Sequence, residues 1–416
     1  MKTPIRVLLP GLLLALPPVS ALVAAPGPGE APSGAFALWN GRDLSGWYGR
    51  GTEDPTLLWL MPASALQDYQ NASMETLSSH WTAQNDGLQG LGTGLHLTTR
   101  EEYGDFELWA EFSADTGAKA GIGLRGCPAS LPEARGDDAP SATSWHALHL
   151  QLIGELLTIQ LDGSDKVVES RLENPFDPTR ARPAPAHGPI QLQAIGGTVR
   201  WRHLFLRPIS PEEANHFLSL RASEGFTELF NGKDLTGWQG TTTGYEVKDG
   251  TFVCKPGHRG ALLTTEEYGN FVLRCEFKLP PGANSGLALR APNFGDPSRE
   301  GLEIQILDQS HPKYSGKLQP TEHNGSIVGL VAAQTGYLRA PSEWNFEEVI
   351  VDGQRIEIIL NGTRILQTDL SKINLLQTRK IPKGLTKRKG FIGIAGHNDP
   401  VAFRRFEVKR LADSGP

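Results

Sequence analysis

The chain has 416 residues, of which 39% are hydrophobic and 21% charged, and its formal net charge is −6. At about 150 residues per domain, this length predicts two or three units of an ordinary soluble globular protein, and we take two as the working number. The charge balance lacks the basic excess that phosphate binding requires, so it excludes nucleic acid as a partner.

The first segment, residues 1–25, is predicted to be a secretory signal peptide. Two basic residues precede an apolar run from Val7 to Leu16, and small residues follow up to the expected cleavage near Ala24 or Ala25. Residues 26–34 would then be a flexible leader. An uncleaved membrane anchor is the alternative, but prolines interrupt the apolar run. No other stretch is suited to span a bilayer, so we expect an exported periplasmic or extracellular protein with no stable membrane span after cleavage.

Beyond the leader, the composition favours an all-β fold. Glycine (47) and proline (30) are frequent, and long amphipathic helical repeats are hard to find, so the chain should turn often between short extended segments. Three cysteines, Cys127, Cys254 and Cys275, are too few for a disulfide framework and have no zinc-ligand spacing. We interpret them as buried apolar residues and leave a Cys254–Cys275 bridge open.

The chain repeats itself. "LWNGRDLSGWYG" at 38–49 returns as "LFNGKDLTGWQG" at 229–240, a mixture of turn formers and apolar anchors that we interpret as the structural start of a domain. Further on, Tyr103 and Arg125 have counterparts at Tyr268 and Arg290. Both offsets are 165 positions (268 − 103 and 290 − 125), so we infer a tandem duplication.

Local patterns predict the elements of the linker and the second copy. The segment between the copies should contain a short helix from Pro211 to Leu220 with Ser210 as its N-cap. Apolar and polar residues alternate along Phe271–Lys278, as in a half-buried strand. "RIEIILNGTRIL" is typical of two strands joined by a turn at Asn361 and Gly362.

Short antiparallel strands of this kind must bury their apolar faces between two sheets. We therefore predict two jelly-roll β-sandwiches in tandem. Their expected bounds are 35–209 for the first sandwich, 210–225 for the linker and 226–411 for the second sandwich.

Six ordered motifs carry a family resemblance: "LFNGKDLTGW", "GANSGLALR", "GLEIQILD", "SEWN", "LNG" and "GHNDPVAFRRFEV". Over residues 226–411 the chain resembles the 3-keto-disaccharide hydrolase domain family, and residues 35–209 look like a weaker copy. The resemblance implies a concanavalin A-like jelly roll, export from a bacterium, and activity on sugars oxidised at carbon 3.

The copies differ at polar positions. Aligning "ALHLQLIG" with "GLEIQILD" places His149 at Glu303, Gln151 at Gln305 and Gly154 at Asp308. On this alignment about 45 residues of the second copy (199 − 154, the change in offset) are missing from the first. The first copy is therefore expected to be a degenerate partner without general acid–base groups.

A second alignment covers the closing strands. "PIQLQAIGGTVRWRHL" aligned with "FIGIAGHNDPVAFRRF" places Ile195 at His397 and Gly196 at Asn398, and keeps Arg202 for Arg404.

The implied chemistry centres on a ketone. A 3-keto group acidifies the hydrogen on carbon 2, so a base can remove it, an enolate forms, the glycosidic oxygen on carbon 1 leaves, and water then adds. This route needs one base and one electrophile in place of two flanking carboxylic acids. We favour Glu303 or His397 as the base, keep Asp308 as a candidate that equally suits a turn or cap, and expect Arg290 or Arg404 to stabilise the enolate.

Amides, a hydroxyl, a guanidinium and an aromatic ring would suit the sugar itself. The expected substrate-binding residues are Asn284, Ser285, Gln305, Trp344, Asn345, Asn398 and Arg404. A structural ion pair is the alternative for Arg404. The residues expected to converge within one concavity are Arg290, Glu303, Gln305, Trp344, His397 and Arg404.

Other roles stay open. Glu303, Asp308, His323 and His397 form no recognisable ligand signature, so the cofactor is undetermined and a divalent metal remains open. A non-catalytic, lectin-like carbohydrate-binding sandwich is the rival function, and a structural wall or matrix component is a third. The combination of Glu303 with His397 favours the enzyme, because a binding module needs no base.

Overall fold

The computed structural model describes residues 29–84, 86–129, 131, 144–163, 167–179, 181–375 and 381–412. The predicted signal peptide and the start of the leader lie outside the described residues. Among those described, no helix is both long and apolar enough to cross a membrane.

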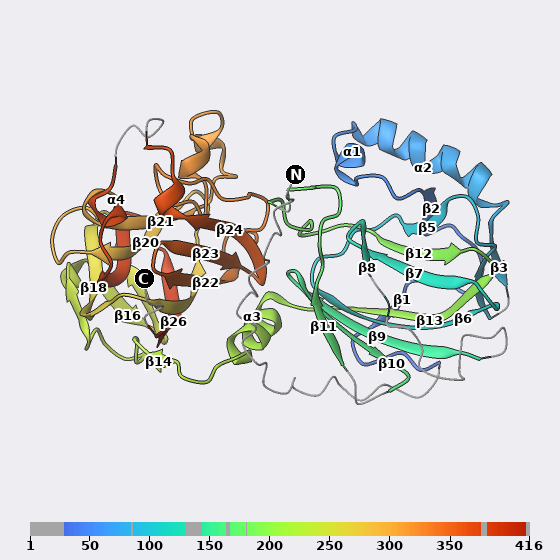
Figure 1. Cartoon of the computed structure of the whole chain (residues 1–416), viewed down its shortest axis with the longest axis horizontal. Helices are drawn as coiled ribbons and strands as arrows, with labels where there is room; N and C mark the ends of the chain where they lie inside the picture. The colour runs from blue at the N-terminus through green and yellow to red at the C-terminus, as the bar shows by residue number, and fades with distance from the viewer. Residues whose placement is uncertain are drawn as a thin grey trace, which may run out of the picture.

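Two β-sandwiches lie side by side, the N-terminal one in blue and green and the C-terminal one in yellow to red (Figure 1). Each consists of one eight-stranded and one five-stranded antiparallel sheet, and each encloses its own hydrophobic core. The predicted fold class, all-β with two jelly-roll sandwiches in tandem, is confirmed.

The strands of the N-terminal sandwich are β1 (Phe36–Ala37), β2 (Trp47–Arg50), β3 (Trp81–Gln84), β4 (Gly87–Gly90), β5 (His96–Thr99), β6 (Phe106–Ala114), β7 (Lys119–Leu124), β8 (Cys127–Ala129), β9 (His146–Ile153), β10 (Leu156–Leu161), β11 (Val168–Arg171), β12 (Ile190–Ile195) and β13 (Val199–Pro208). The larger sheet has the order β11-β10-β9-β6-β13-β4-β3, with β1 paired to β13. The smaller sheet has the order β2-β5-β12-β7-β8.

The strands of the C-terminal sandwich are β14 (Thr227–Glu228), β15 (Trp238–Gly240), β16 (Tyr245–Lys248), β17 (Thr251–Cys254), β18 (Arg259–Tyr268), β19 (Phe271–Lys278), β20 (Asn284–Ala291), β21 (Leu302–Leu307), β22 (Trp344–Asp352), β23 (Arg355–Leu360), β24 (Thr363–Asp369), β25 (Gly390–His397) and β26 (Ala402–Arg410). The larger sheet has the order β16-β17-β26-β19-β22-β23-β24, with β14 paired to β26. The smaller sheet has the order β15-β18-β25-β20-β21.

Helices are few. In the first copy, α1 (Thr56–Trp59) and α2 (Ala63–Leu77) form an insertion, and α2 packs on β2, where Ser73 accepts a hydrogen bond from the Gly49 amide. In the second copy, α4 (Pro297–Glu300) follows β20. The short 3₁₀ segments described are Thr242–Gly244, Pro312–Tyr314, Pro320–Glu322, Leu370–Lys372 and Lys383–Leu385.

The linker helix is confirmed as α3 (Pro211–Leu220). The Ser210 side chain accepts a hydrogen bond from the Glu213 amide, as an N-cap does. The helix is not a free tether, because it contributes to a third apolar cluster that joins both copies. The buried members of that cluster are Ile153, Ile209, Ala214, Leu218 and Phe346.

Two predicted turns are present. Asn231 accepts hydrogen bonds from the amides of Lys233 and Asp234, so the repeated phrase is a turn. Asn361 and Gly362 both have positive φ, 51° and 81°, and join β23 to β24 as the Asn-Gly pattern predicted. All three cysteines are free and buried, which confirms their interpretation as core residues.

The matching strand orders correct one alignment of the copies. β9 corresponds to β22, and β8 corresponds to β21, so His149 is the counterpart of Glu348 and not of Glu303. The true counterpart of Glu303 is Pro128, because each pairs with the equivalent position of the neighbouring strand. The alignment was misled because alternating apolar strands resemble one another, and a one-strand error preserves the alternation.

The corrected offsets also change the size and place of the missing segment. They are 165 positions at β7 and β20, 175 at β8 and β21 (303 − 128) and 199 at β9 and β22 (348 − 149). About 34 residues of the second copy (199 − 165) are therefore absent from the first, on either side of β21. On this alignment the counterpart of Glu303 is the apolar Pro128.

Candidate active site

The five-stranded sheet of the C-terminal sandwich brings Glu303 and His397 together. Glu303 lies on β21 and His397 ends β25, with β20 between these strands. Nε2 of His397 lies 2.8 Å from Oε1 of Glu303. The structure therefore places the two favoured base candidates in one hydrogen-bonded pair.

A glycine makes this contact across a strand possible. Gly286 on β20 pairs with Gln305, which lies two residues after Glu303 on β21 and therefore on the same face of the sheet. A Cβ atom at Gly286 would lie only 2.2 Å from Oε1 of Glu303, so the carboxylate occupies the space that a side chain would fill. Neighbouring positions on the same face are also small, Ala288 and Ala395 among them. Small residues therefore line the face of the sheet beneath the Glu303–His397 pair.

Burial differs between the partners. Glu303 is only 3% exposed, whereas the His397 side chain is 32% exposed. Burial raises the pKa of Glu303, although the hydrogen bond and charge of His397 oppose this rise. Burial lowers the pKa of His397, but Glu303 outweighs it, and the net pKa of the imidazole is raised. The part-exposed imidazole is therefore a stronger base than usual, supported by the carboxylate of Glu303 beneath it.

A cation beside this pair was not among the predicted residues. Arg259 on β18 pairs directly with His397 across the ladder, is exposed, and has no ion pair or hydrogen bond of its guanidinium among the described residues. Its charge acts to lower the pKa of His397. The sequence contained one indication of Arg259. At the offset of 165 its counterpart in the first copy is Gly94, so the charged side chain occurs in the second copy alone at this position.

Amide groups lie next to the pair. Nε2 of Gln305 donates to Oδ1 of Asn284 at 2.6 Å, and both lie on the same face as Glu303. The backbone N–H of Asn284 donates to Oδ2 of Asp399, just beyond His397 and Asn398. These predicted sugar-binding residues are close to the candidate base. Ser285 is not, because it alternates with them and its hydroxyl donates to the Ala395 carbonyl.

Asp308 has the turn role that was kept as its alternative. Its Oδ1 accepts from Ser310 and its Oδ2 accepts from the Gly282 amide. Burial acts to raise the pKa of Asp308, but these hydrogen bonds outweigh it and lower the pKa below its usual value. A carboxylate held in this way is a weak base, so the structure does not place Asp308 in the catalytic role.

Arg290 does not face the pair. It has positive φ (51°), is 1% exposed, and donates to Gln354 and to the Gly353 carbonyl. Its counterpart Arg125 has the same backbone conformation and likewise donates to backbone carbonyls. Because both copies keep this buried guanidinium, its role is to bind loops together, which corrects its assignment as the enolate stabiliser.

Arg404, Trp344 and Asn345 belong to the other sheet and do not converge with Glu303. Arg404 forms an ion pair with Glu276 at 2.6 Å and stacks on the Trp344 ring, 4.1 Å from its centroid. The expected alternation with Phe406 fails because Arg405 adopts positive φ (48°) at a β-bulge, which reverses the face.

The first copy repeats this arrangement, which identifies it as structural. There Arg202 pairs with Glu111 and stacks on Trp145. The ion pair that was the alternative for Arg404 is therefore what the structure shows. Asn345 is equally internal, since it accepts hydrogen bonds from Arg339 and Asn361.

The corresponding face of the first copy is filled by larger side chains and has no counterpart of the Glu303–His397 pair. Ile195 stands at the position of His397, as predicted, and Pro128 at that of Glu303. Gln191 and Gln193 replace Gly393 and Ala395, and Gln193 donates to Gln191 at 2.8 Å. Residues kept in both copies thus stabilise the sandwich, whereas the polar group around Glu303 occurs in the second copy.

No group of three or more His, Cys, Asp or Glu side chains within the described part of the chain is arranged to hold a metal ion. His323, one of the residues considered for such a group, lies at the end of the 3₁₀ segment Pro320–Glu322.

The sequence matches the family of the 3-keto-alpha-glucoside-1,2-lyase-like domain over residues 34–141 and 225–409, more than half of the chain. The chain belongs to this family. The lyase-like domain match covers all the strands of the second copy and the early strands of the first.

Individual relatives of this lyase-like domain have been named. The 3-keto-disaccharide hydrolase of Bacteroides thetaiotaomicron is 24% identical over 230 residues, covering 45% of this chain and 79% of the relative. Two crystal structures from Parabacteroides distasonis, both of provisionally assigned glycosyl hydrolases, are 30% and 25% identical. They cover 45% and 46% of this chain and 99% and 96% of their own, each with a TM-score of 0.40.

Proposed function

We propose that the C-terminal sandwich cleaves the glycosidic bond of 3-keto-glycosides, with His397 as the base, Glu303 as its positioning partner and Arg259 as the cation that stabilises the enolate. The observation that carries this proposal is the 2.8 Å contact between a buried carboxylate and a part-exposed imidazole. Membership of the lyase-like family and the name of the Bacteroides relative support the substrate class.

The proton transfer follows from which nitrogen is free. Nε2 of His397 is engaged by Glu303, so Nδ1 is the atom left to take the hydrogen from carbon 2 of the sugar. The buried carboxylate fixes the ring and stabilises the imidazolium that forms, the arrangement by which a base gains strength in a catalytic triad. The pair needs no second catalytic carboxylic acid.

The electrons of the broken C2–H bond form the enolate, with negative charge on the ketone oxygen at carbon 3. A guanidinium on the strand beside His397 can hold that charge as it develops. When the enolate collapses, the C1–O bond breaks and the leaving oxygen takes a proton, which the imidazolium can return. Addition of water across the resulting double bond completes hydrolysis, and release before this step gives a lyase.

A direct test compares the wild-type protein with His397→Ala and Arg259→Gln on 3-keto-trehalose, measuring released glucose. We expect each variant to lose about 10²-fold or more in kcat/KM, the usual contribution of a general base or an oxyanion-stabilising group. Unoxidised trehalose should not react with any of them, since its carbon 2 hydrogen is not acidic.

The first copy supplies a matched control. His146 lies 2.8 Å from Asp162, the same separation as in the proposed site, but on the other sandwich. His146→Ala should leave kcat/KM within about twofold of the wild type once its melting temperature shows that it is folded. Equal losses in His146→Ala and His397→Ala, or binding of the keto sugar without turnover by the wild type, would overturn the proposal.

We also propose that the protein is exported and that residues 1–25 are removed. Mass spectrometry of the mature protein from its native host should find an N-terminus after Ala24 or Ala25, and an intact Met1 in the exported fraction would contradict this.

A further inference from the structure

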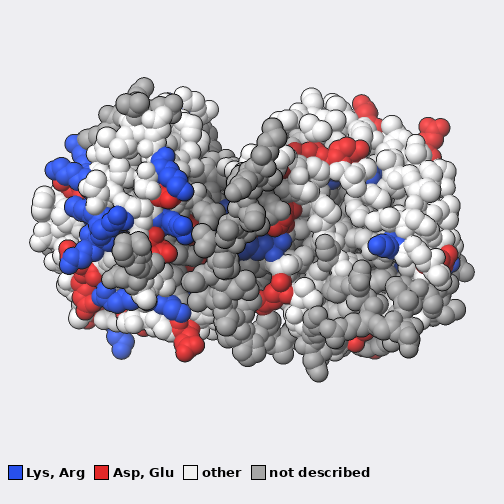
Figure 2. Space-filling model, in the orientation of Figure 1, with Lys and Arg blue, Asp and Glu red and all other residues white. Residues whose placement is uncertain are grey.

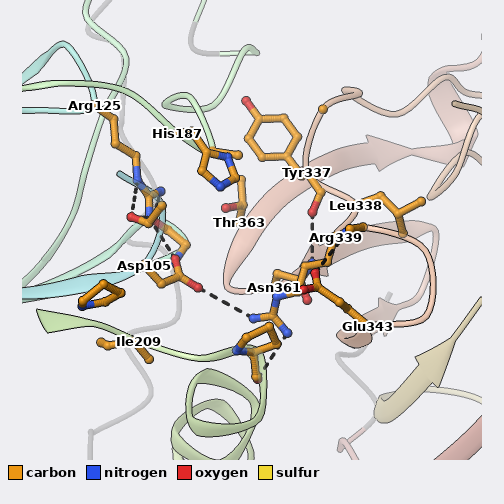
Figure 3. A pocket seen from close by; sticks show the side chains of 17 residues that line it. Asp105, Arg125, His187, Ile209, Tyr337, Leu338, Arg339, Glu343, Asn361 and Thr363 are labelled. Atoms are coloured by element: carbon orange, nitrogen blue, oxygen red, sulfur yellow. Dashed lines mark hydrogen bonds and ion pairs between the residues drawn. The ribbon is translucent and has the colours of Figure 1, made fainter. Parts of the chain in front are cut away.

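A hollow of about 390 Å³ lies between the two sandwiches, away from Glu303 and His397. Its lining comes from both copies and from the linker: Asp105, Arg125 and His187 on one side, Tyr337, Arg339 and Glu343 on the other, with Ile209 beneath (Figure 3). This volume is in the usual range for small-molecule sites, roughly 300–1,000 Å³.

One contact across the hollow is incomplete. Nη2 of Arg339 lies 3.7 Å from Oδ2 of Asp105, which is too long for a hydrogen bond. This Nη2 atom is buried and has no hydrogen-bond partner within the described residues. The other nitrogen, Nη1, is already held by Asn215 at 2.6 Å and by the Trp344 carbonyl at 2.7 Å, so the guanidinium cannot move to close the gap.

A hydroxyl group has the chemistry that this gap requires. It can accept from the Arg339 N–H and donate to the Asp105 carboxylate at once, whereas an anion or a cation can satisfy only one of them. Asp105 is itself fixed, because its Oδ1 accepts from Arg125 and from the Gly154 amide. The acceptor and the donor are thus both preorganised.

The charges of the lining favour a neutral ligand. Two carboxylates, Asp105 and Glu343, stand against two guanidinium groups, Arg125 and Arg339, so neither sign of charge is in excess. His187 at the mouth has no hydrogen bond or ion pair within the described part of the chain. Tyr337, Leu338 and Ile209 add apolar surface of the kind that packs on the C–H face of a sugar ring.

We propose that this hollow is a second carbohydrate site, which binds a neutral sugar of one or two rings through a hydroxyl placed between Arg339 and Asp105. The site does not depend on the function proposed above. Since both sandwiches supply its walls, a sugar bound there would hold the two copies together.

The test is calorimetric titration of the full-length protein with trehalose. Ala186→Trp places a large side chain in the hollow without removing a side-chain hydrogen bond, and Ala340→Trp does the same from the other sandwich. Ala332→Trp is the matched control, because Ala332 lines a different hollow between the sandwiches. We expect at least a tenfold loss of affinity in the first two variants and unchanged affinity in the third.

His397→Ala separates this site from the proposed active site. The inference requires His397→Ala to bind trehalose like the wild type. It is overturned if Ala186→Trp and Ala340→Trp both retain full affinity, if only His397→Ala loses it, or if the wild type shows no binding, which would mean that the hollow holds solvent only. Melting temperatures check that each variant is folded. If one of the two tryptophan variants does not fold, the affinity of the other decides the test.

Discussion

Glu303 raises the pKa of His397 and so makes the imidazole a stronger base. Burial alone lowers the pKa of His397, and the hydrogen bond and charge of Glu303 raise it above its usual value. Glu303→Gln keeps the shape but removes the charge, so the pKa of His397 should fall. The acidic limb of the kcat/KM profile should then move to lower pH, while the maximal rate drops about 10²-fold because the base is weaker and less well held.

The pH profile separates this role from a merely structural one. A variant that only loosened the sheet would lose rate at every pH without moving the limb. An acidic limb at the wild-type position in Glu303→Gln would therefore show that Glu303 does not act through His397.

Glu347 is a second buried carboxyl with a different consequence. It points into the core of the second sandwich, is 0% exposed, and neither oxygen has a hydrogen-bond partner within the described residues. Burial raises its pKa to about 8. Between the ordinary value of 4.5 and about 8, the unfolded chain releases a proton that the folded chain retains, so this carboxyl favours folding less and less as pH rises through that window.

The first copy shows the replacement to test, because Leu148 is the counterpart of Glu347. Glu347→Leu should have a higher free energy of unfolding than the wild type. This difference should increase between pH 5 and pH 8 by on the order of 4 kcal/mol. Urea denaturation at both pH values measures this difference. A difference that stays constant with pH would mean that Glu347 is ionised in the folded protein.

At the scale of single elements, β20 makes room for the site, because Gly286 leaves space for the carboxylate of Glu303. Gly286→Ala would put a Cβ atom 2.2 Å from Oε1 of Glu303, so the carboxylate should be displaced from His397. We expect at least a tenfold loss of kcat, because the new Cβ atom would also lie 2.7 Å from Cγ of Glu303, so the whole side chain must shift. Steady-state kinetics on a 3-keto-glucoside measure it.

The duplicated strand supplies the control. Gly121 on β7 is the counterpart of Gly286, and its Cβ atom would lie 2.5 Å from Oε1 of Gln193. Gly121→Ala makes the same change against the same kind of atom in the other sandwich, so activity should not change. Equal effects of the two substitutions on kcat would contradict the placement of the site on β20 and its neighbours.

The elements themselves were largely predictable. The strand at β19, the Asn361-Gly362 turn and the Ser210 N-cap are local signals, and each is present, but β19 is buried on both faces and is not the half-buried strand that its alternation predicted. What the sequence could not supply was the face of Arg404, because one residue of positive φ at Arg405 reverses the alternation without leaving a compositional mark.

The candidate site was predictable only in part, for a related reason. Glu303 and His397 are 94 residues apart, and only the strand order shows that one strand lies between them. Residue type alone also favoured Arg290 and Arg404 over Arg259, although the first two have counterparts in Arg125 and Arg202. The better criterion was present in the duplicated sequence: a polar residue lacking a counterpart is the one free to serve the site.

At the scale of the whole molecule, the two sandwiches are fixed to each other by backbone contacts as well as by α3. The amide of Glu155 donates to the Gly362 carbonyl at 3.2 Å, and its carboxylate accepts from the Arg364 amide. Most of the basic side chains on the face seen in Figure 2 belong to the C-terminal sandwich. Two hairpin turns therefore form the seam of the molecule.

Gly154 decides how closely these turns approach. It has positive φ (57°), and a Cβ atom there would lie 2.4 Å from the Asn361 carbonyl oxygen of the other sandwich. Gly163 has nearly the same φ (61°) but open space around it. Both alanine variants bear the backbone strain, about 1–2 kcal/mol, and only Gly154→Ala must also push the sandwiches apart. Its melting temperature should be lower than that of Gly163→Ala by about 3–6 °C, and its rate of proteolysis at the linker should rise. Equal melting temperatures would mean that separating the two turns costs no stability. The two sandwiches would then be independent units joined by a flexible linker.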